Sequence, residues 1–350
     1  MKTIAITFLF ILSACSSENN TENSDPKTPE AKNYVSYFTG NKVDKITAPK
    51  GGICLMGGAT ENDQAMKWFL NRADGGDVLI LRTSGTDGYN SYLYTSLGIA
   101  INSVETIVFK NAKASSDANI IEKINNAEAI WFGGGDQWEY VSYWRNTPIS
   151  EAINKAIINR KVDVGGTSAG MAIQGGFYFS AQNGTITSQE ALLNPFDTKV
   201  TISNESFLDN AILKDVITDT HYDNPDRKGR HIAFLARIIN DYKAQGKGIA
   251  CDEYTSVCID EKGIARVFGN YPSKDDVAYF IMPNTEIPNN KPEICKPNNP
   301  LEWNLNKVAI SVYEVKGTSA GTNTFNLNNW IDGTGGTWKK WFVENGKLNE

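Results

Sequence analysis

Short apolar runs alternate with helical segments through most of the chain. The runs lie at 51–58, 77–84, 106–110, 129–132 and 162–164. Between the first two runs, Met66, Phe69 and Leu70 recur at the spacing of one helix face. Apolar strands that alternate with amphipathic helices are typical of βαβ units. The pattern therefore predicts an α/β fold, with a parallel sheet covered by helices on both faces.

The second half of the chain changes character twice. Residues 216–222 predict a strand, 230–242 a helix, and 248–259 with 265–267 a pair of strands. Proline and asparagine then crowd 283–300, and the last fifty residues are β-like and rich in glycine, asparagine and tryptophan. We interpret 34–287 as the folded domain and 288–350 as a linker with a small β-rich C-terminal extension. That extension is either an appended sheet or a sorting tail.

The N-terminus predicts export. Lys2 precedes an apolar run that is too short to span a bilayer, and the run ends in Leu12-Ser13-Ala14-Cys15. These small residues before a cysteine resemble a bacterial lipoprotein box, so 1–15 is predicted to be a signal peptide and Cys15 to be lipidated. An ordinary secretory signal is the alternative. Residues 16–33 are polar and predict a flexible tether. We expect an exported lipoprotein anchored to a membrane, on its periplasmic or cell-surface side.

Composition narrows the chemistry. The 350 residues carry a net charge of −6, which gives no broad electrostatic reason to bind nucleic acid. There are two histidines, so an imidazole base must be His221 or His231, and a multi-histidine metal site is nearly excluded. Cys54, in an apolar strand, is predicted to be a buried free thiol. An oxidising compartment permits disulfides among Cys54, Cys251, Cys258 and Cys295, but spacing does not reveal the pairing.

The strongest candidate for chemistry is a serine in the sequence GTSAG, which follows the apolar run 162–164. A strand that turns sharply into a helix exposes the residue at the turn, here Ser168, and Gly166 and Gly170 give the turn room. The same five residues recur at 317–321, where a strand precedes them but no helical pattern follows. We therefore predict a nucleophile at Ser168 and an ordinary turn serine at Ser319.

A serine nucleophile needs a base and a site for the oxyanion. His231 shares an apolar helix face and is interpreted as a packed, hydrogen-bonded histidine. His221 ends a strand among polar groups and is predicted to be the base. The N–H groups of Ala169 and of a glycine in 133–135, represented by Gly134, would hold the oxyanion. The acid that orients the histidine stays open among five carboxylates: Glu190, Asp219, Asp223, Asp252 and Glu253.

Two arginines follow the predicted base. Arg227 and Arg230 could hold a substrate carboxylate, and ordinary surface charge at a helix start is the alternative. The ends of several predicted strands carry the sequences GGAT, RTSG, GGGD and GTSAG. Because ligand sites form at the carboxyl ends of parallel strands, these segments are expected to converge.

Taken together, four motifs resemble the family of cyanophycinase and the aspartyl dipeptidase called dipeptidase E. They are GGAT at 57–60, FGGGDQ at 132–137, GTSAGM at 166–171, and DTHYDNPDRKGRHIAFL at 219–235. The resemblance implies a flavodoxin-like fold of the class I glutamine-amidotransferase type and serine peptidases without cofactors. It implies Ser168 as nucleophile, His221 as base and a following glutamate as orienter, for which it favours Glu190. Gln137, Asp219 and Arg230 would lie in the substrate pocket.

The resemblance has one informative departure. Cyanophycinase carries a denser arginine cluster after its histidine, whereas Pro225 and Asp226 interrupt that stretch here. The expected function is an exported serine peptidase that hydrolyses peptide or isopeptide bonds, with Asp-containing or β-Asp-Arg substrates as candidates. The alternatives are an esterase or amidase with the same triad and a non-catalytic surface binding lipoprotein. We expect no metal, cofactor or nucleic acid, and a homodimer is left open.

Overall fold

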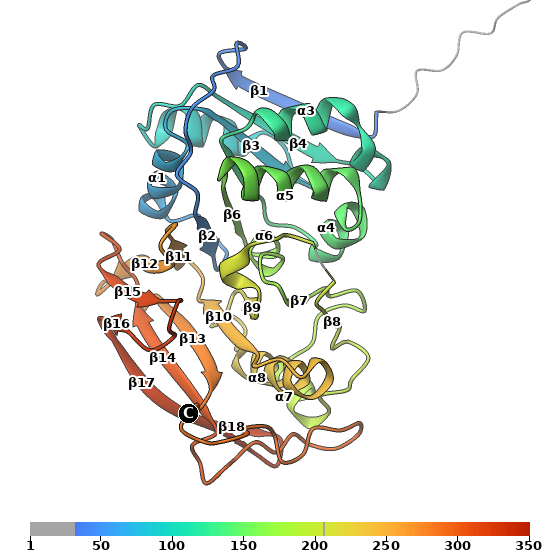
Figure 1. Cartoon of the computed structure of the whole chain (residues 1–350), viewed down its shortest axis with the longest axis vertical. Coiled ribbons are helices and arrows are strands. Elements are labelled where there is room, and N and C mark those ends of the chain that lie inside the picture. The colour runs from blue at the N-terminus through green and yellow to red at the C-terminus, as the bar shows by residue number, and fades with distance from the viewer. Residues whose placement is uncertain (1–31, 206) are drawn as a thin grey trace, which may run out of the picture. The chain divides into compact units, whose positions relative to one another are not determined.

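The predicted parallel strands form the centre of a ten-stranded sheet in the computed structural model (Figure 1). The structure describes residues 32–205 and 207–350, and the predicted signal peptide with Cys15 lies outside them. The parallel order is β4-β3-β5-β6-β2, with β1 antiparallel at one edge and β11, β12, β15 and β16 following antiparallel at the other. In this order along the sheet the bounds are β1 Tyr34–Gly40, β4 Ser103–Phe109, β3 Asp77–Arg82, β5 Ala129–Phe132, β6 Asp163–Thr167, β2 Ile53–Met56, β11 Ser256–Ile259, β12 Ile264–Tyr271, β15 Asn323–Asn326 and β16 Gly333–Thr334.

Helices cover both faces of the parallel strands, as predicted. Alternate side chains of one strand enter different cores: Leu79 and Leu81 of β3 join the core that includes α3 and α5. Val78 and Ile80 join the core on the other face, which includes α1. The described helices are α1 Asp63–Arg72, α2 Gly88–Ser91, η1 Tyr92–Ser96, η2 Ala112–Ser116, α3 Ala118–Asn126, α4 Gln137–Trp144, α5 Pro148–Arg160, α6 Ala169–Ala172, α7 Ser188–Leu193, η3 Ala211–Leu213, α8 Lys228–Arg237 and η4 Ile238–Tyr242. This period-two division confirms the predicted α/β class.

A second sheet of six strands lies beside the first, in the order β18-β17-β14-β13-β10-β9. Only β9 and β10 are parallel to each other, and the remaining pairs are antiparallel. Their bounds are β9 Val216–Asp219, β10 Lys247–Cys251, β13 Val277–Pro283, β14 Ile310–Lys316, β17 Gly336–Glu344 and β18 Lys347–Asn349. Two further short strands, β7 Tyr178–Phe179 and β8 Ile202–Ser203, form a separate pair.

The continuous strand predicted at 248–259 is wrong. The chain leaves the second sheet at Cys251, turns through 252–255, and enters the first sheet at Ser256. Both strands are largely buried, and only the four residues 252–255 separate them, so the prediction merged them into one strand. Tyr254 marks the turn with a φ of 62°. This crossing brings the two sheets together next to the candidate site.

The C-terminal segment is β-rich, as predicted, and it extends both sheets instead of forming a sheet of its own. Strands β14 and β17 continue the second sheet from β13, while β15 pairs with β12 of the first. Leu301 and Trp303, at the start of the predicted β-rich extension, are fully buried. Residues 288–350 are therefore joined to the same core as the strands that precede them.

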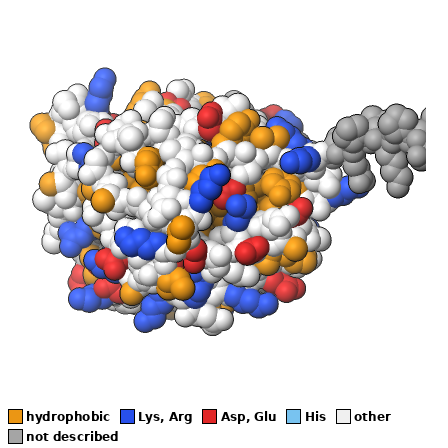
Figure 2. All heavy atoms as spheres, turned by 90° about the horizontal axis from the view of Figure 1, so that it is seen from above, with side chains coloured by type: hydrophobic (Ala, Val, Ile, Leu, Met, Phe, Trp, Pro, Cys, Tyr) orange, Lys and Arg blue, Asp and Glu red, His pale blue; other side chains and the backbone are white. Residues whose placement is uncertain are grey.

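The distribution of charged side chains and the state of Cys54 are features of the whole fold. Basic and acidic side chains are interspersed on the face shown in Figure 2. Cys54 is buried and free, as predicted, and lies opposite Cys258 in the β2–β11 pair, with 3.5 Å between the sulfur atoms. No helix within residues 32–205 or 207–350 combines the length and hydropathy needed to span a bilayer.

Candidate active site

Ser168 occupies the predicted sharp turn between β6 and α6. Its backbone has φ 52° and ψ −117°, a conformation that residues with a side chain rarely adopt. The neighbouring glycines are required by close packing. A Cβ at Gly166 would lie 2.5 Å from the carbonyl carbon of Gly170, and a Cβ at Gly170 would lie 2.1 Å from the oxygen of Phe132. The turn therefore forms as the sequence predicts.

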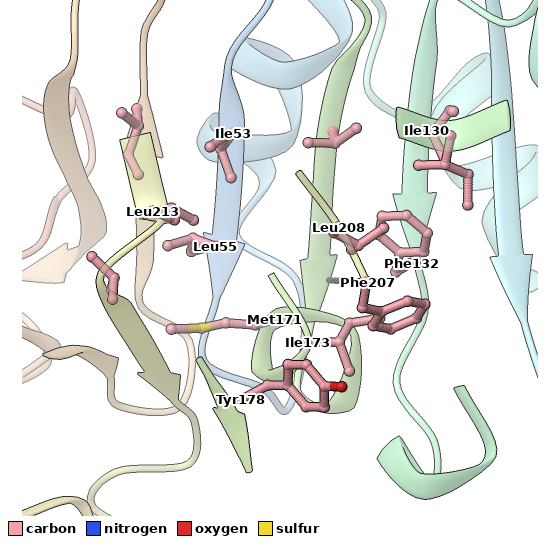
Figure 3. Close-up of a cluster of buried hydrophobic side chains, with 14 of the residues drawn as sticks. Ile53, Leu55, Ile130, Phe132, Met171, Ile173, Tyr178, Phe207, Leu208 and Leu213 are labelled. Carbon is pink, nitrogen blue, oxygen red and sulfur yellow. The ribbon is translucent and has the colours of Figure 1, made fainter. Parts of the chain in front are cut away.

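Buried hydrophobic side chains hold the turn in place. Met171 and Ile173, which follow the serine, are buried in the core that includes Leu55, Phe132 and Tyr178 (Figure 3). These residues come from β2, β5 and β7, so three strands hold the segment that carries the nucleophile. A rigid scaffold of this kind keeps a reactive side chain in one position.

The second GTSAG copy has none of this support. Ser319 lies in an exposed turn between β14 and β15, and no helix follows it. Its prediction as a turn serine is confirmed.

His221 meets the serine, as predicted. Its Nε2 lies 2.8 Å from Ser168 Oγ, within hydrogen-bond distance. The histidine follows β9 with a φ of 46°, and its side chain is half-buried, with 22% of its surface exposed. The two side chains thus come from different sheets: Ser168 follows β6 of the first and His221 follows β9 of the second.

The acid that contacts the histidine is Glu253. Its Oε1 lies 2.6 Å from His221 Nδ1, and the hydrogen bond to the imidazole holds the pKa of Glu253 below its ordinary value. A carboxylate at Nδ1 favours the tautomer with its proton there. That tautomer leaves the Nε2 lone pair facing the serine hydroxyl. The backbone N–H of Glu253 donates to Asp223 Oδ1 at 2.9 Å, which fixes the turn between β10 and β11.

The family resemblance favoured Glu190 as the acid that orients His221, and this assignment is wrong. Its carboxylate accepts from the backbone N–H of Thr187 at 3.0 Å and from Lys199 at 3.0 Å, and so completes the N-terminal cap of α7. The Thr187 N–H, followed by Lys199, lowers the pKa of Glu190 to about 2. The capping box engages this glutamate locally, and within the described residues no hydrogen bond or ion pair joins it to His221.

Backbone hydrogen bonds from the end of β2 and the first two residues of GGAT bind the segments that carry Ser168, His221 and Glu253. The carbonyls of Met56, Gly57 and Gly58 accept in turn from the N–H groups of Ser168 at 3.1 Å, His221 at 2.8 Å and Tyr254 at 3.1 Å. Tyr254 directly follows the acid Glu253. The end of β2 therefore holds the segments of Ser168, His221 and Glu253 next to one another, a role that the motif alone did not reveal.

The two residues whose N–H groups were predicted to bind an oxyanion, Ala169 and Gly134, lie close to the serine. Ala169 begins α6 directly after the serine, and a Cβ built on Gly134 would lie 3.7 Å from the Ser168 Cβ. Within the described residues, neither N–H donates to a backbone or side-chain acceptor. Both are thus free to bind a developing negative charge next to the serine.

Three of the four predicted pocket residues already bind other groups of the protein. Asp219 and Arg230 form a buried ion pair in which each side chain is 4% exposed. Burial opposes ionisation of Asp219, but the Arg230 charge and hydrogen bonds hold the pKa of that carboxyl below its ordinary value. Gln137 donates to the backbone oxygen of Phe179. Each of these three side chains already has a protein partner.

Arg227 differs from Arg230 because no carboxylate of the described residues lies within 4 Å of it. It donates to the oxygen of Thr220 at 3.0 Å, directly before the base. Burial and the nearby Arg230 charge lower the pKa of Arg227 to about 10. This arginine is the better candidate of the two for a substrate carboxylate.

His231 is fully buried, as predicted for a packed histidine. It crosses the ring of Tyr222 edge-on at 5.6 Å. Neither ring nitrogen makes a hydrogen bond of ordinary geometry within the described residues, so the expected hydrogen bond is not found.

The sequence of this chain is similar to those of known proteins. The model of peptidase family S51 matches residues 86–267, a little over half of the chain, and this range contains Ser168, His221 and Glu253. Cyanophycinase from Synechococcus elongatus is 26% identical over 234 residues, which cover 63% of this chain and 66% of that protein, just under two thirds. Cyanophycinase from Trichormus variabilis is 22% identical over 288 residues, 79% of this chain and 89% of that one.

A solved peptidase structure from an acI-B1 actinobacterium has a TM-score of 0.47 and 15% identity, with coverage of 64% of this chain and 89% of that chain. The family match rests on sequence, and its range holds the serine, the histidine and the glutamate that the fold brings together. The chain belongs to peptidase family S51.

Proposed function

We propose that this protein is a serine peptidase in which Ser168, His221 and Glu253 act as the catalytic triad. The observation that carries the proposal is the continuous relay of 2.8 Å from hydroxyl to imidazole and 2.6 Å from imidazole to carboxylate. The names of the curated relatives support peptide or isopeptide hydrolysis as the reaction.

In the proposed reaction, His221 Nε2 takes the proton from Ser168 Oγ as the oxygen attacks a substrate carbonyl. Glu253 stabilises the imidazolium that forms. The oxyanion binds the N–H groups of Ala169 and Gly134. His221 then gives its proton to the leaving amine, and the acyl-enzyme remains on Ser168. Water, activated by the same imidazole, hydrolyses the acyl-enzyme and restores the serine.

A fluorophosphonate probe tests the nucleophile directly, and the chain supplies its own control. Ser168→Ala removes the turn serine of the first GTSAG, whereas Ser319→Ala removes the exposed serine of the second. We expect labelling of the natural protein and of Ser319→Ala, and none of Ser168→Ala. Peptide hydrolysis should fall on the order of 10⁴-fold or more in Ser168→Ala. An unlabelled natural protein, or a labelled Ser168→Ala, would refute the proposal.

An esterase or amidase with the same triad is the main alternative. Matched peptide, ester and primary-amide substrates separate the two activities, because a peptidase must release an amine from a peptide bond. Turnover of esters without any peptide would favour the alternative.

We further propose that the protein is exported and anchored through a lipid on Cys15, as its N-terminal sequence indicates. Mass spectrometry of the membrane fraction should find a diacylated N-terminal cysteine. Cys15→Ser should abolish the modification and move the protein out of that fraction. An unmodified Cys15 in the mature chain would contradict this part of the proposal.

A further inference from the structure

One buried tyrosine holds the glycine loop 133–135, which carries one of the two predicted oxyanion donors. Tyr140 is fully buried, and its hydroxyl donates to the carbonyl oxygen of Gly133 at 2.7 Å. Its ring also reaches the end of the loop, because a Cβ on Gly135 would lie 3.8 Å from Tyr140 Cε2. Tyr140 lies outside the four sequence motifs, so nothing in the sequence drew attention to it.

The hydrogen bond to Gly133 fixes the direction of the next N–H group. The oxygen of Gly133 and the N–H of Gly134 belong to one planar peptide unit, and in a trans peptide they point in opposite directions. Within residues 32–205 and 207–350 every cis peptide precedes a proline, so this peptide is trans. Because the oxygen points to the Tyr140 hydroxyl, the N–H of Gly134 points away from it.

Gly134 is also the residue of the loop that lies next to the nucleophile. A Cβ on Gly134 would lie 3.7 Å from Ser168 Cβ, and no hydrogen bond from its N–H is found within the described residues. The Gly133 oxygen instead packs against Gly170, where a Cβ would lie 2.9 Å from it. The carbonyl is therefore enclosed between Tyr140 and Gly170, and the N–H is left for the oxyanion.

Glycines on both sides make this peptide easy to rotate. No Cβ on Gly133 or Gly134 restricts the two backbone angles that turn it. The N–H of Gly133 donates to the oxygen of Leu81 at 3.1 Å, which holds the preceding peptide and not this one. A buried carbonyl that loses its donor lowers its free energy by turning to another partner. That rotation would turn the Gly134 N–H as well.

Tyr140 can hold the peptide because its own side chain is fixed. It lies in the first turns of α4, directly after the loop, and helical side chains lean toward the N-terminus of their helix. Trp144, one turn further on, packs edge-on against its ring, with 4.7 Å between the ring centroids. Burial raises the pKa of Tyr140, so the hydroxyl keeps its proton and remains a donor.

We propose that Tyr140 is a positioning residue, whose hydroxyl orients the Gly133–Gly134 peptide so that the N–H of Gly134 binds the oxyanion. This inference rests on the proposed function, because it concerns the same reaction. The N–H binds the charged oxygen of the transition state more strongly than the uncharged carbonyl of the substrate. Loss of the hydroxyl should therefore lower kcat and leave KM nearly unchanged.

Tyr140→Phe keeps the ring and removes the hydroxyl. With a fluorogenic peptide selected from a library by hydrolysis with the natural protein, we expect kcat to fall by about 10- to 100-fold and KM to stay within about twofold. The matched control is Tyr313→Phe. Tyr313 is also buried, and its hydroxyl also binds the backbone, accepting from the N–H of Gly336 at 3.0 Å in the second sheet. This control should keep the natural kcat.

A peptide aldehyde of the same sequence gives a measurement that packing alone would not change. Ser168 Oγ bonds to the aldehyde carbon while its proton passes to His221, and the electron pair of the broken C=O π bond leaves a negative charge on the aldehyde oxygen. We expect Tyr140→Phe to weaken inhibition by about the same factor as it lowers kcat. Calorimetric titration with the uncleaved peptide should give equal Kd values for Ser168→Ala and for Ser168→Ala combined with Tyr140→Phe.

Several outcomes would overturn the inference. They are a kcat within about twofold of the natural value in Tyr140→Phe, a loss confined to KM, unchanged inhibition by the aldehyde, or the same loss of kcat in Tyr313→Phe. A shifted pH midpoint of kcat/KM in Tyr140→Phe would also overturn it, because the variant would then act through the imidazole.

Fluorophosphonate labelling keeps this inference separate from the proposed function. If the natural protein is labelled at Ser168, any of these outcomes removes the role of Tyr140 and leaves the triad in place. If the natural protein is not labelled, the proposed function itself is refuted.

Discussion

Two glutamates illustrate how a role is settled at the scale of single residues. Glu190 stands in an attractive place, shortly after the serine turn, but Thr187 and Lys199 engage its carboxylate. Glu253 follows the histidine by thirty-two positions and reaches Nδ1 at 2.6 Å. Hydrogen-bond partners, and not order along the chain, decide which carboxylate orients the imidazole.

Replacement of each glutamate by glutamine separates the two roles. Glu253→Gln should lower kcat by about 10⁴-fold, because a neutral amide no longer stabilises the imidazolium or its tautomer. Glu190→Gln should leave kcat within about twofold and lower the melting temperature slightly, because the cap of α7 weakens. Steady-state kinetics and thermal unfolding measure both. The assignment would be reversed by a severe loss in Glu190→Gln and an active Glu253→Gln.

A site residue could be predicted where its signal lies in the local sequence, and not where its role depends on contacts made only in the folded chain. Ser168 and His221 could be found because a strand–turn–helix pattern is local and the chain has only two histidines. Glu253 stayed among five candidates, since the short segment 252–255 does not reveal that the chain changes sheets there and brings this carboxylate to His221.

At the scale of elements, the end of β2 is the part that places the triad. Its successive carbonyls bind the segments of Ser168, His221 and Glu253. The sequence predicted that the strand ends would converge, and these hydrogen bonds confirm it for GGAT and GTSAG. For GGGD and RTSG the support is close approach: a Cβ on Gly134 would lie 3.7 Å from the Ser168 Cβ, and one on Gly135 would lie 3.4 Å from Ser84 Oγ. The strands of the parallel core were predictable because burial on both faces leaves continuous apolar runs. The division into two sheets was not predictable, since pairing partners far apart in sequence leave no local pattern.

Gly58→Ala tests this placement. The residue has a φ of 130°, and a Cβ would lie 2.4 Å from the His221 ring, so the imidazole must move. We expect kcat to fall by about 100-fold, as small displacements of catalytic groups commonly cause. Gly98→Ala is the matched control: its φ is also positive, at 69°, but no atom lies within 4 Å of a Cβ there. Equal activity of the two variants would contradict the role of the β2 end.

At the scale of the whole molecule, burial of His231 makes stability depend on pH. Burial lowers the pKa of His231 from 6.5 to about 4, and the nearby Arg230 adds to this while Asp219 opposes it. In the unfolded chain the imidazole takes up its proton near pH 6.5. Between about pH 6.5 and 4 the unfolded state therefore binds more protons, and the free energy of unfolding falls as the pH drops.

Denaturant unfolding at several pH values measures this effect. His231→Leu, compared with the natural protein, should remove a pH-dependent loss on the order of 3 kcal/mol between pH 6.5 and 4. Taking the difference between the two curves cancels the carboxylates that titrate in the same range. Parallel curves would show that His231 does not drive the acid sensitivity.

Ser168 follows a strand of the first sheet, His221 follows a strand of the second, and Glu253 lies in the turn that joins the two sheets. The rate of hydrolysis therefore depends on how the two sheets are aligned with each other. A slip of about an ångström along their boundary is enough to part the reacting atoms, although each sheet keeps its own ladder of hydrogen bonds. Such a protein loses its activity before it unfolds. Substitutions far from Ser168 can therefore abolish hydrolysis while the circular dichroism spectrum stays unchanged.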